Sequence, residues 1–434
     1  MTTDRRNFLK AGTAAAFTTS LFTGNVKGAN DRLSVGFIGM GKMGRSNLNF
    51  AMKQENVVVP AVCDVFERNL KMAVDYTRAH APQPARAVKD FREILADKSI
   101  DAVCIATPDH WHAYMEVEAC KAGKDVYVEK PVSVTIDEGK KMVLAARKYN
   151  RVVQAGTMQR SAVHFDKAAA MVRDGQLGQI TFVRTWNYSH AAPEGYGNPP
   201  DSEPPATLDW NAWLGPAPYH AYNPNRFGVD PKDKYFSTFR WFFDYAGGMM
   251  TDWGVHWLDI VQLAFNEQMP KAVTASGGKF YVKDNRETPD TLQVTYEYPG
   301  FLAVYENREA NSQSMFEKGG GILFCGTRGT MFLDRQGFKI IPEKGSDLKA
   351  EEVKSSDSGN ARHWANFLEC IKTRQRPTSD IEKCFRSTST CLLGNIALQT
   401  RLHLDWDSQQ LTIAQPEGRA RMSREERAPW KIEV

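Results

Sequence analysis

Short apolar runs alternate with longer amphipathic segments over the first third of the chain after about residue 30. The apolar runs cover residues 33–39, 57–64, 100–106, 125–129 and 152–155. This alternation of strand-like and helix-like patterns is what a parallel sheet with crossover helices requires. We therefore predict an α/β domain at residues 32–156, with a doubly wound parallel sheet of the Rossmann type. In such sheets, ligands lie beyond the carboxyl ends of the strands.

The pattern changes after residue 156. It predicts a helix at 165–174, a strand at 180–186, a loop at 191–234 rich in Pro, Gly, Trp and Tyr, a helix around Asp252, alternating strands between 271 and 333, and helices between 359 and 401. Strand runs and helices that are not interleaved indicate an α+β arrangement. The second domain, at residues 157–405, should therefore hold a largely antiparallel open sheet, and residues 406–434 read as a polar tail.

A glycine turn joins the first predicted strand to the helix that follows it. In a G-x-G-x-x-G turn the first glycine permits the sharp bend, the second lets the backbone approach a pyrophosphate, and the third allows close helix–strand packing. The second apolar run ends in Asp64, about twenty residues on, where a carboxylate can bind ribose hydroxyls and repel a 2'-phosphate. This pattern predicts dinucleotide binding and favours NAD over NADP, although Arg68, one turn further on, could weaken that preference. The predicted cofactor residues here are Gly39, Met40, Gly41, Lys42, Met43, Gly44, Asp64 and Arg68.

The helix around Asp252 carries the strongest catalytic signal. Asp252, His256 and Asp259 stand at i, i+4 and i+7, so they should share one helix face. A histidine can accept a hydroxyl proton near neutral pH, and an adjacent carboxylate can fix its tautomer. We predict His256 as a general base held by Asp252, with a surface acid–histidine pair as the alternative.

Further candidates follow the later strands of the first domain. Pro108 and His112 come after the strand at 100–106, and Glu129 and Lys130 end the strand at 125–129, so all four should lie at the same sheet edge as the glycine turn. Lys130 could hydrogen-bond the oxygen whose proton His256 takes. His110 and His112 could bind a metal, but no third ligand stands at a useful spacing, so we predict no metal site.

Candidate substrate residues come from the aromatic-rich region after residue 156. Aromatic rings can pack on the apolar faces of sugars, and polar groups can bind the hydroxyls. We predict substrate contacts for Arg160, Tyr188, Trp210 and Trp241. An interdomain ion pair is the alternative for Arg160, and ordinary packing is the alternative for the aromatic residues.

Composition and the N-terminal segment narrow the setting. The chain has 434 residues, 42% of them hydrophobic, and a formal net charge of +4, which suits a two-domain enzyme and indicates no nucleic-acid partner. Residues 1–29 carry Arg5 and Arg6 followed by a mild apolar stretch, which resembles a twin-arginine export signal. That stretch is too short to span a bilayer. We predict folded export through the twin-arginine machinery to the periplasm, with a membrane tether if the segment is retained.

Taken together, these motifs resemble those of the Gfo/Idh/MocA family, named for glucose–fructose oxidoreductase and inositol dehydrogenase. The resemblance covers about residues 32–405 and is most specific at the glycine turn, Pro108 with His112, the triplet 129–131, and the segment 247–256. It implies that Lys130, Asp252 and His256 are catalytic, that the substrate is a carbohydrate, and that the exposed face of the second sheet forms a homo-oligomer.

The resemblance leaves two functions open. The first is NAD-dependent oxidation of a secondary alcohol in a sugar or sugar derivative. The second is redox-neutral, NAD-dependent glycoside hydrolysis through transient oxidation at C3 and elimination. Because some glycosidase members lack the lysine triplet and Lys130 is retained here, the oxidoreductase is favoured. The sugar, the carbon that is oxidised and the number of subunits are left open.

Overall fold

The computed structural model describes residues 32–190, 195–229 and 237–434. The predicted export segment at 1–29, residues 191–194 and residues 230–234 of the predicted loop lie outside the described residues. Within the described ranges, no helix has both the length and the apolar character needed to cross a membrane.

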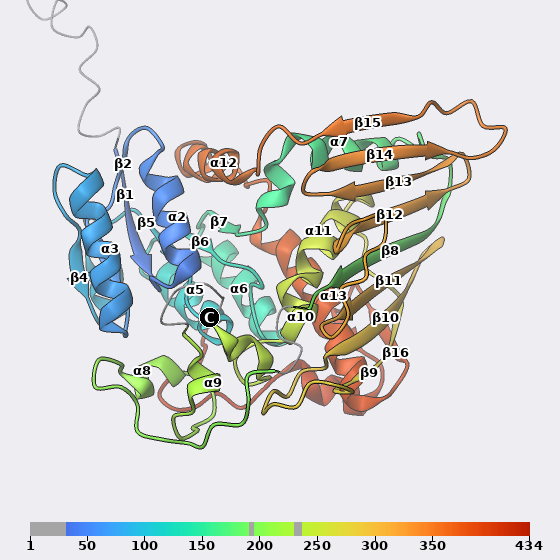
Figure 1. Ribbon diagram of the computed structural model, residues 1–434. Coiled ribbons are helices and arrows are strands. Elements are labelled where there is room, and N and C mark those ends of the chain that lie inside the picture. The colour runs from blue at the N-terminus through green and yellow to red at the C-terminus, as the bar shows by residue number, and fades with distance from the viewer. Residues whose placement is uncertain (1–31, 191–194, 230–236) are drawn as a thin grey trace, which may run out of the picture.

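The first domain is the predicted parallel sheet with helices on both faces (Figure 1). Its strand order is β4-β3-β1-β5-β6-β7, with β2 beside β1, and every pair is parallel. The strands are β1 (Leu33–Ile38), β2 (Val57–Val58), β3 (Ala61–Cys63), β4 (Arg86–Val88), β5 (Ala102–Ile105), β6 (Asp125–Val128) and β7 (Val153–Ala155). The helices are α2 (Lys42–Met52), α3 (Glu67–His80), α4 (Phe91–Ala96), α5 (His112–Lys121) and α6 (Ile136–Lys148). Because β5 and β6 are buried on both faces, β5 is a continuous apolar run and β6 is apolar after Asp125.

The second domain holds a ten-stranded sheet of order β15-β14-β13-β12-β8-β11-β10-β9-β16-β17. Only β8 and β11 pair in parallel among the described strands of this sheet, so the predicted, largely antiparallel sheet is confirmed. The strands are β8 (Ile180–Tyr188), β9 (Ala272–Gly278), β10 (Thr291–Tyr298), β11 (Phe301–Arg308), β12 (Gly320–Gly326), β13 (Gly329–Asp334), β14 (Gly337–Pro342), β15 (Glu351–Lys354), β16 (Leu404–Asp407) and β17 (Thr412–Ile413).

Helices cover one face of this second sheet. The helices α7 (Val163–Arg173), α11 (Gly254–Ala264) and α13 (Ile381–Thr400) pack against the sheet, and α11 and α13 lie on the side that faces the first domain (Figure 1). The alternating burial of β10 reflects a strand with one face in this core and one face outside it. The shorter helices are α8 (Trp210–Leu214), α9 (Pro224–Phe227), α10 (Gly248–Asp252) and α14 (Pro416–Arg419), with 3₁₀ turns at Asp109–Trp111, Met158–Ser161, Thr238–Trp241 and Ala420–Met422.

Two late segments return to the first domain. Helix α12 (Asn360–Thr373) packs on the Rossmann sheet through Trp364, whose ring stacks on Tyr127 at 4.7 Å and whose Nε1–H donates to Asn47. At the end of the chain, Trp430 packs against Trp111 with ring centroids 4.9 Å apart. The sequence pattern predicts that α12 belongs to the second domain and that residues 406–434 form a polar tail. The structure instead places large apolar rings from both segments against the first domain.

Candidate active site between the two domains

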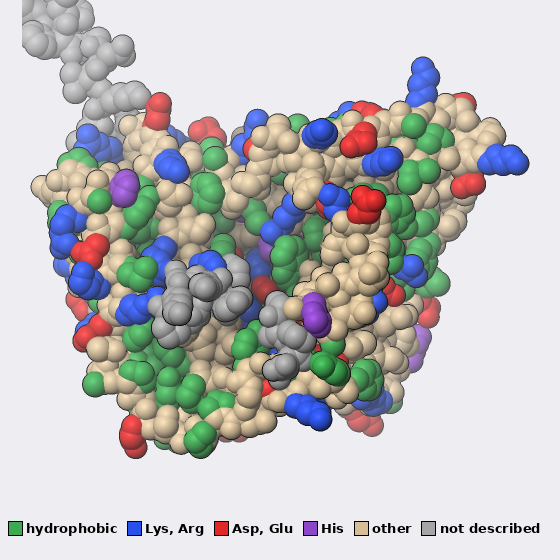
Figure 2. Space-filling view, viewed as in Figure 1, with side chains coloured by type: hydrophobic (Ala, Val, Ile, Leu, Met, Phe, Trp, Pro, Cys, Tyr) green, Lys and Arg blue, Asp and Glu red, His purple; other side chains and the backbone are tan. Residues whose placement is uncertain are grey.

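A cavity of about 530 Å³ lies where the carboxyl ends of the parallel strands meet the second domain. The molecular surface is hollowed between the two domains (Figure 2). The volume is within the range of small-molecule and cofactor sites. The predicted site residues that line it are Gly39, Gly41, Lys42, Met43, Asp64, Pro108, His112, Glu129, Lys130, Asp252 and His256.

The glycine turn has the shape that a dinucleotide requires. Gly39 has a φ of +86°, and a Cβ there would lie 2.6 Å from the Thr107 nitrogen. A Cβ on Gly44 would lie 1.8 Å from the Gly39 oxygen, so that glycine is needed for close packing. A Cβ on Gly41, by contrast, would meet no described protein atom within 4 Å. The room at Gly41 therefore fits the close approach of a pyrophosphate.

Helix α2 directs its N-terminus at this space. Its N-cap is Gly41, no side chain caps it, and its first turn contains no acidic residue. Its first N–H groups and the positive end of its dipole thus suit an anionic group. Met40, by contrast, is fully buried and acts through its backbone. The donor set and the glycine geometry together fit NAD.

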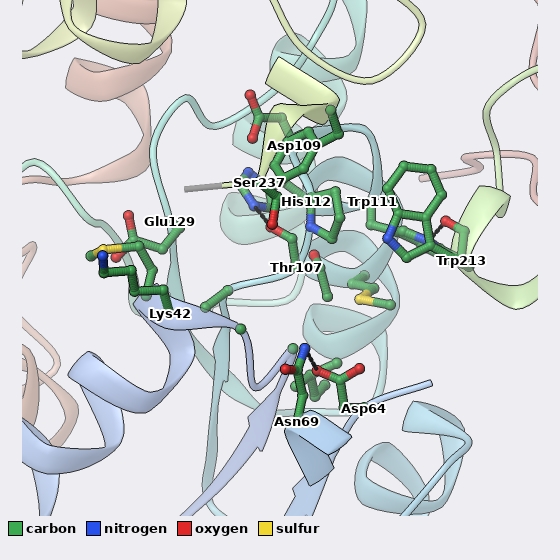
Figure 3. Close-up of a pocket in the computed structure, with 18 of the residues that line it drawn as sticks. Lys42, Asp64, Asn69, Thr107, Asp109, Trp111, His112, Glu129, Trp213 and Ser237 are labelled. Atoms are coloured by element: carbon green, nitrogen blue, oxygen red, sulfur yellow. Dashed lines mark hydrogen bonds between the residues drawn. The ribbon is translucent and has the colours of Figure 1, made fainter. Parts of the chain in front are cut away.

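Asp64 follows β3 at the same edge. Its carboxylate accepts hydrogen bonds from the N–H groups of Met40 at 2.7 Å and Phe66 at 2.8 Å, and from the Asn69 amide at 3.3 Å (Figure 3). Burial raises the pKa of Asp64, while the backbone hydrogen bonds from Phe66 and Met40 lower it. Oδ2 accepts two of these bonds and Oδ1 accepts one, so Oδ1 keeps acceptor capacity for a ribose hydroxyl. Asn69, not predicted, also lines the cavity, whereas Arg68 is not among the lining residues.

An ion pair joins the two domains at the other end of the cavity. The Lys130 ammonium donates to the Asp252 carboxylate at 2.6 Å and to the Asp252 carbonyl at 3.0 Å. Arg240 approaches the same carboxylate at 3.5 Å. Burial alone would raise the pKa of Asp252, but these two cations outweigh it and hold the pKa at about 2. Asp252 is therefore a carboxylate engaged by Lys130 and Arg240, and the prediction that it holds His256 is corrected.

His256 lines the cavity one turn further along. Its side chain is buried, and Nδ1 has no hydrogen-bond partner among the described residues. Burial lowers the pKa of His256 well below its ordinary value, and the positive charges of Lys130 and Arg335 lower it further. The imidazole is therefore neutral.

Asp259 does not join this group. The helix tightens at Trp253, whose carbonyl accepts the His256 N–H, and this separates α10 from α11. The Asp259 carboxylate then binds Arg160 at 2.7 Å and the Ser387 hydroxyl at 2.6 Å. The predicted common face of Asp252, His256 and Asp259 is therefore not formed.

Two of the residues predicted at the sheet edge, His112 and Glu129, hold the backbone of the loops that line the cavity. His112 places its two ring nitrogens 2.7 Å from the Pro131 carbonyl and 2.9 Å from the Thr107 carbonyl, which ties the two rim loops together. Burial lowers its pKa to about 4. Glu129 accepts hydrogen bonds from the Asn47 amide and the Lys130 N–H, which orients the start of the triplet.

Asp109, which was not predicted as a site residue, lines the cavity directly after Pro108 (Figure 3). Burial raises its pKa to about 7, although Arg240 and Lys130 oppose that rise. Its position beyond the end of β5, at the edge where ligands bind, was the signal that could have identified it.

The predicted substrate residues are located elsewhere. Arg160 is fully buried and binds Asp259 at 2.7 Å and Glu267 at 2.6 Å, so its guanidinium is engaged in ion pairs within the second domain and not in the interdomain pair that was the alternative. Tyr188 donates its hydroxyl to Glu306 at 2.6 Å and lies under Arg308.

The two tryptophans are also structural. Trp210 stacks on Trp213 at 4.7 Å and donates to the His220 carbonyl, while Trp241 lies under Arg286 at 5.0 Å. Neither these rings nor Arg160 and Tyr188 are among the cavity-lining residues. The four substrate predictions are therefore corrected, because each side chain is used in packing or ion pairing.

Two further segments contribute to the cavity wall, α8 and the C-terminal segment. Asn211, Ala212 and Trp213 contribute from α8, and Trp430 contributes from the C-terminal segment. Arg427 binds the Gly215 carbonyl at 2.7 Å and the Asn211 side chain at 2.8 Å, which holds the two segments together. Arg92, after β4, lies over the Trp430 ring at 5.7 Å. These segments border the end of the cavity near Asp64.

Across the described ranges, no group of three or more His, Cys, Asp or Glu side chains is arranged to hold a metal ion. His110 contacts the Trp213 carbonyl through Nε2, and His112 contacts the Thr107 carbonyl through Nε2. Both ring nitrogens of His112 and the Nε2 of His110 are therefore used in the fold.

Two family descriptions match most of the chain. The oxidoreductase family with an NAD-binding Rossmann fold, Gfo/Idh/MocA, matches residues 33–157. The C-terminal α/β domain of the same oxidoreductase family matches residues 179–432. The first domain is thus an NAD-binding Rossmann domain, as predicted.

Curated relatives match part of the chain. A glycosyl hydrolase family 109 protein from Shewanella baltica is 31% identical over 207 residues, which are 41% of this chain and 44% of that protein. The uncharacterised oxidoreductase YrbE from Bacillus subtilis is 31% identical over 147 residues, 34% of this chain and 42% of that protein. These matches span less than half the length of each relative.

Solved structures share the fold over most of their length. Aldose-aldose oxidoreductase from Caulobacter crescentus, complexed with glycerol, has a TM-score of 0.63 at 18% identity and covers 86% of this chain and 99% of its own. The WlbA dehydrogenase from Bordetella pertussis, in complex with NADH and UDP-GlcNAcA, has a TM-score of 0.64 at 15% identity, with coverage of 87% and 99%.

We expect Asp64→Ala to weaken NAD binding by about 10- to 100-fold, because hydrogen bonds to a charged group are lost. NADP binding should fall far less, since the substitution also removes repulsion of the 2'-phosphate. Titration calorimetry with each dinucleotide measures both affinities. An equal loss for the two would assign the ribose contact to another residue.

We expect Trp430→Ala to speed the release of bound NADH by about 10-fold, because a large ring leaves the cavity wall. Displacement of NADH followed by its fluorescence in a stopped-flow instrument measures the rate. Phe280→Ala is the control, because Phe280 is 74% exposed and does not line the cavity. Identical release rates for both variants and the parent would exclude a role for the C-terminal segment.

Proposed function

The chain belongs to the Gfo/Idh/MocA oxidoreductase family, and on that premise we propose that it oxidises a secondary alcohol of a sugar or sugar derivative with bound NAD. The observation that carries this proposal is the position of Lys130, Asp252 and His256 on the cavity that the glycine turn also lines. A proton acceptor and a cation thus face the space beside a dinucleotide site.

The side chains divide the proton chemistry between them. NAD, when bound, supplies a hydride acceptor for the carbon that carries the hydroxyl group. His256 accepts the hydroxyl proton, because its side chain lines the cavity and its Nδ1 has no hydrogen-bond partner among the described residues. Lys130 donates a hydrogen bond to the same oxygen and stabilises the negative charge that develops there.

Asp252 acts as a positioning residue in this scheme. It binds the Lys130 ammonium through both its carboxylate and its carbonyl, which fixes the ammonium at the domain boundary. Arg240 shares the carboxylate and limits its movement. The Lys130 ammonium is thereby held near His256, while Asp252 makes no ion pair with His256.

The match to glycosyl hydrolase family 109 proteins favours a second candidate, redox-neutral glycoside hydrolysis. Oxidation at C3 would acidify the C2 proton, a base would remove it, and the C1 leaving group would depart. Water would then add at C1, C2 would regain a proton, and reduction of the C3 ketone would restore the cofactor. His256 and Lys130 would serve the proton transfers of both schemes.

The cellular setting is also a proposal. The Arg5–Arg6 pair in the N-terminal segment supports folded export through the twin-arginine machinery to the periplasm. The outer face of the second sheet, with Leu302 exposed on it, supports a homo-oligomer. A folded route suits a protein that must take up its cofactor before export.

The proposed function predicts a lasting rise in absorbance at 340 nm when NAD-loaded protein meets its sugar, with a keto-sugar as product. A panel of free sugars and aryl glycosides, with product analysis, tests this directly. Aglycone release with bound NAD unchanged at the end would establish the glycosidase instead. Neither signal from a broad panel would count against both candidates.

We expect His256→Ala and Lys130→Met each to lower turnover by about 10²- to 10⁴-fold, the usual contribution of a general base or its partner. NAD affinity should stay within a few-fold, because both residues lie at the far end of the cavity from Asp64. Single-turnover absorbance at 340 nm measures the rate. His403→Ala and Lys344→Met are matched controls on the exposed surface, and equal rates for all four variants would refute the assignment.

A further inference from the structure

Arg335 lies in the turn between β13 and β14 and lines the cavity near His256. Two contacts hold it there. Its Nε–H donates to the Gln159 side chain at 3.0 Å, and its guanidinium lies over the Trp253 ring at 4.4 Å. Gln159 is itself 2% exposed and donates its amide to the His256 carbonyl at 3.1 Å. The guanidinium is therefore fixed relative to the proposed base.

Arg335 differs from the other arginines of this region in its charge partners. Arg160 binds Asp259 and Glu267, and Arg286 binds Asp284 and Glu309. No carboxylate of the described residues lies within 4.0 Å of the Arg335 guanidinium.

The acid that acts on Arg335 electrostatically is already engaged elsewhere. The Asp252 carboxylate, which does influence Arg335 electrostatically, is bound by Lys130 and shared with Arg240. Around His256, both neighbouring charges that shift its pKa are positive, those of Lys130 and Arg335. This end of the cavity thus holds a cation with donors to spare beside the reacting position.

We infer that Arg335 binds a carboxylate of the substrate, and that the substrate is an acidic sugar such as a uronic acid or its glycoside. An arginine fork offers two parallel N–H donors that match the two oxygens of a carboxylate. With Nε occupied by Gln159 and one face on Trp253, the Nη donors remain for this contact. The inference rests on the proposed function, since it concerns the sugar that the same cavity takes.

Matched pairs of sugars test the substrate class. The probes are glucuronate with glucose, galacturonate with galactose, and mannuronate with mannose, which differ only in a carboxylate at C6. Quenching of tryptophan fluorescence in NAD-loaded protein measures binding without requiring turnover. In at least one pair, the acid should bind about 10- to 100-fold more tightly than the neutral sugar, as expected for a charge-assisted contact.

Substitution tests the residue. Arg335→Gln should lose the preference for the acid and change neutral-sugar binding by less than about 3-fold, and Arg335→Lys should keep part of the preference, because the charge stays and the fork is lost. Arg328→Gln is the matched control, on the neighbouring β12–β13 turn, where the arginine pairs with Asp347 on the surface. NAD affinity should be the same in all variants.

Several outcomes would overturn the inference. Neutral sugars binding as tightly as their acids in every pair would reject the substrate class, and so would a preference for glucose 6-phosphate over glucuronate. An acid preference that survives in Arg335→Gln would reject the residue, and a matching loss of NAD affinity would assign Arg335 to the cofactor phosphates. If an acidic sugar binds through Arg335 but neither reduces NAD nor releases an aglycone, the proposed function fails while the binding site stands.

Discussion

The ion pair between Lys130 and Asp252 is the contact on which the arrangement of the site depends. It joins the carboxyl end of a Rossmann strand to a helix of the second domain across 122 residues of sequence. A partly buried pair of this kind is tolerated when its geometry is good and further hydrogen bonds satisfy it, as the Asp252 carbonyl does here. Because α11 begins just after Asp252, the same contact places His256 beside the cofactor space.

Other contacts reinforce this alignment of the two domains. Trp364 of α12 packs on Tyr127 in the Rossmann sheet, and Trp430 packs on Trp111 near the end of the chain. Helix α12 follows β15 in the sequence, and Trp430 follows the last strand of the second sheet. Both rings nevertheless lie against the first domain. The cofactor space is thus enclosed by segments that are far apart in sequence, which accounts for a cavity wall drawn from both domains.

The two tryptophans that were predicted to contact substrate, Trp210 and Trp241, are used in packing. Trp210 and Trp241 pack against other side chains, because burying a large ring in a protein core removes its whole apolar surface from water. Other aromatic rings, among them Trp213 and Trp430, do line the cavity, and the same cavity presents Asp109, Arg335 and the Lys130–Asp252 pair. A charged group that a hydrogen bond holds in place, as Gln159 holds Arg335, can select a polar ligand.

The sequence by itself determined the parallel sheet, the glycine turn, the acid at Asp64 and the edge at which Lys130 and His112 lie, because each follows from local periodicity or short-range spacing. Only the tertiary structure decided the partners of the charged side chains. Asp252 could have oriented His256 by helical spacing alone, yet it binds Lys130, and Arg160 turns to Asp259 and Glu267. The places of Trp430 and Arg335 at the cavity were likewise settled by tertiary contacts. Such pairings depend on which groups burial brings together across a hundred or more residues, and no local pattern encodes that choice.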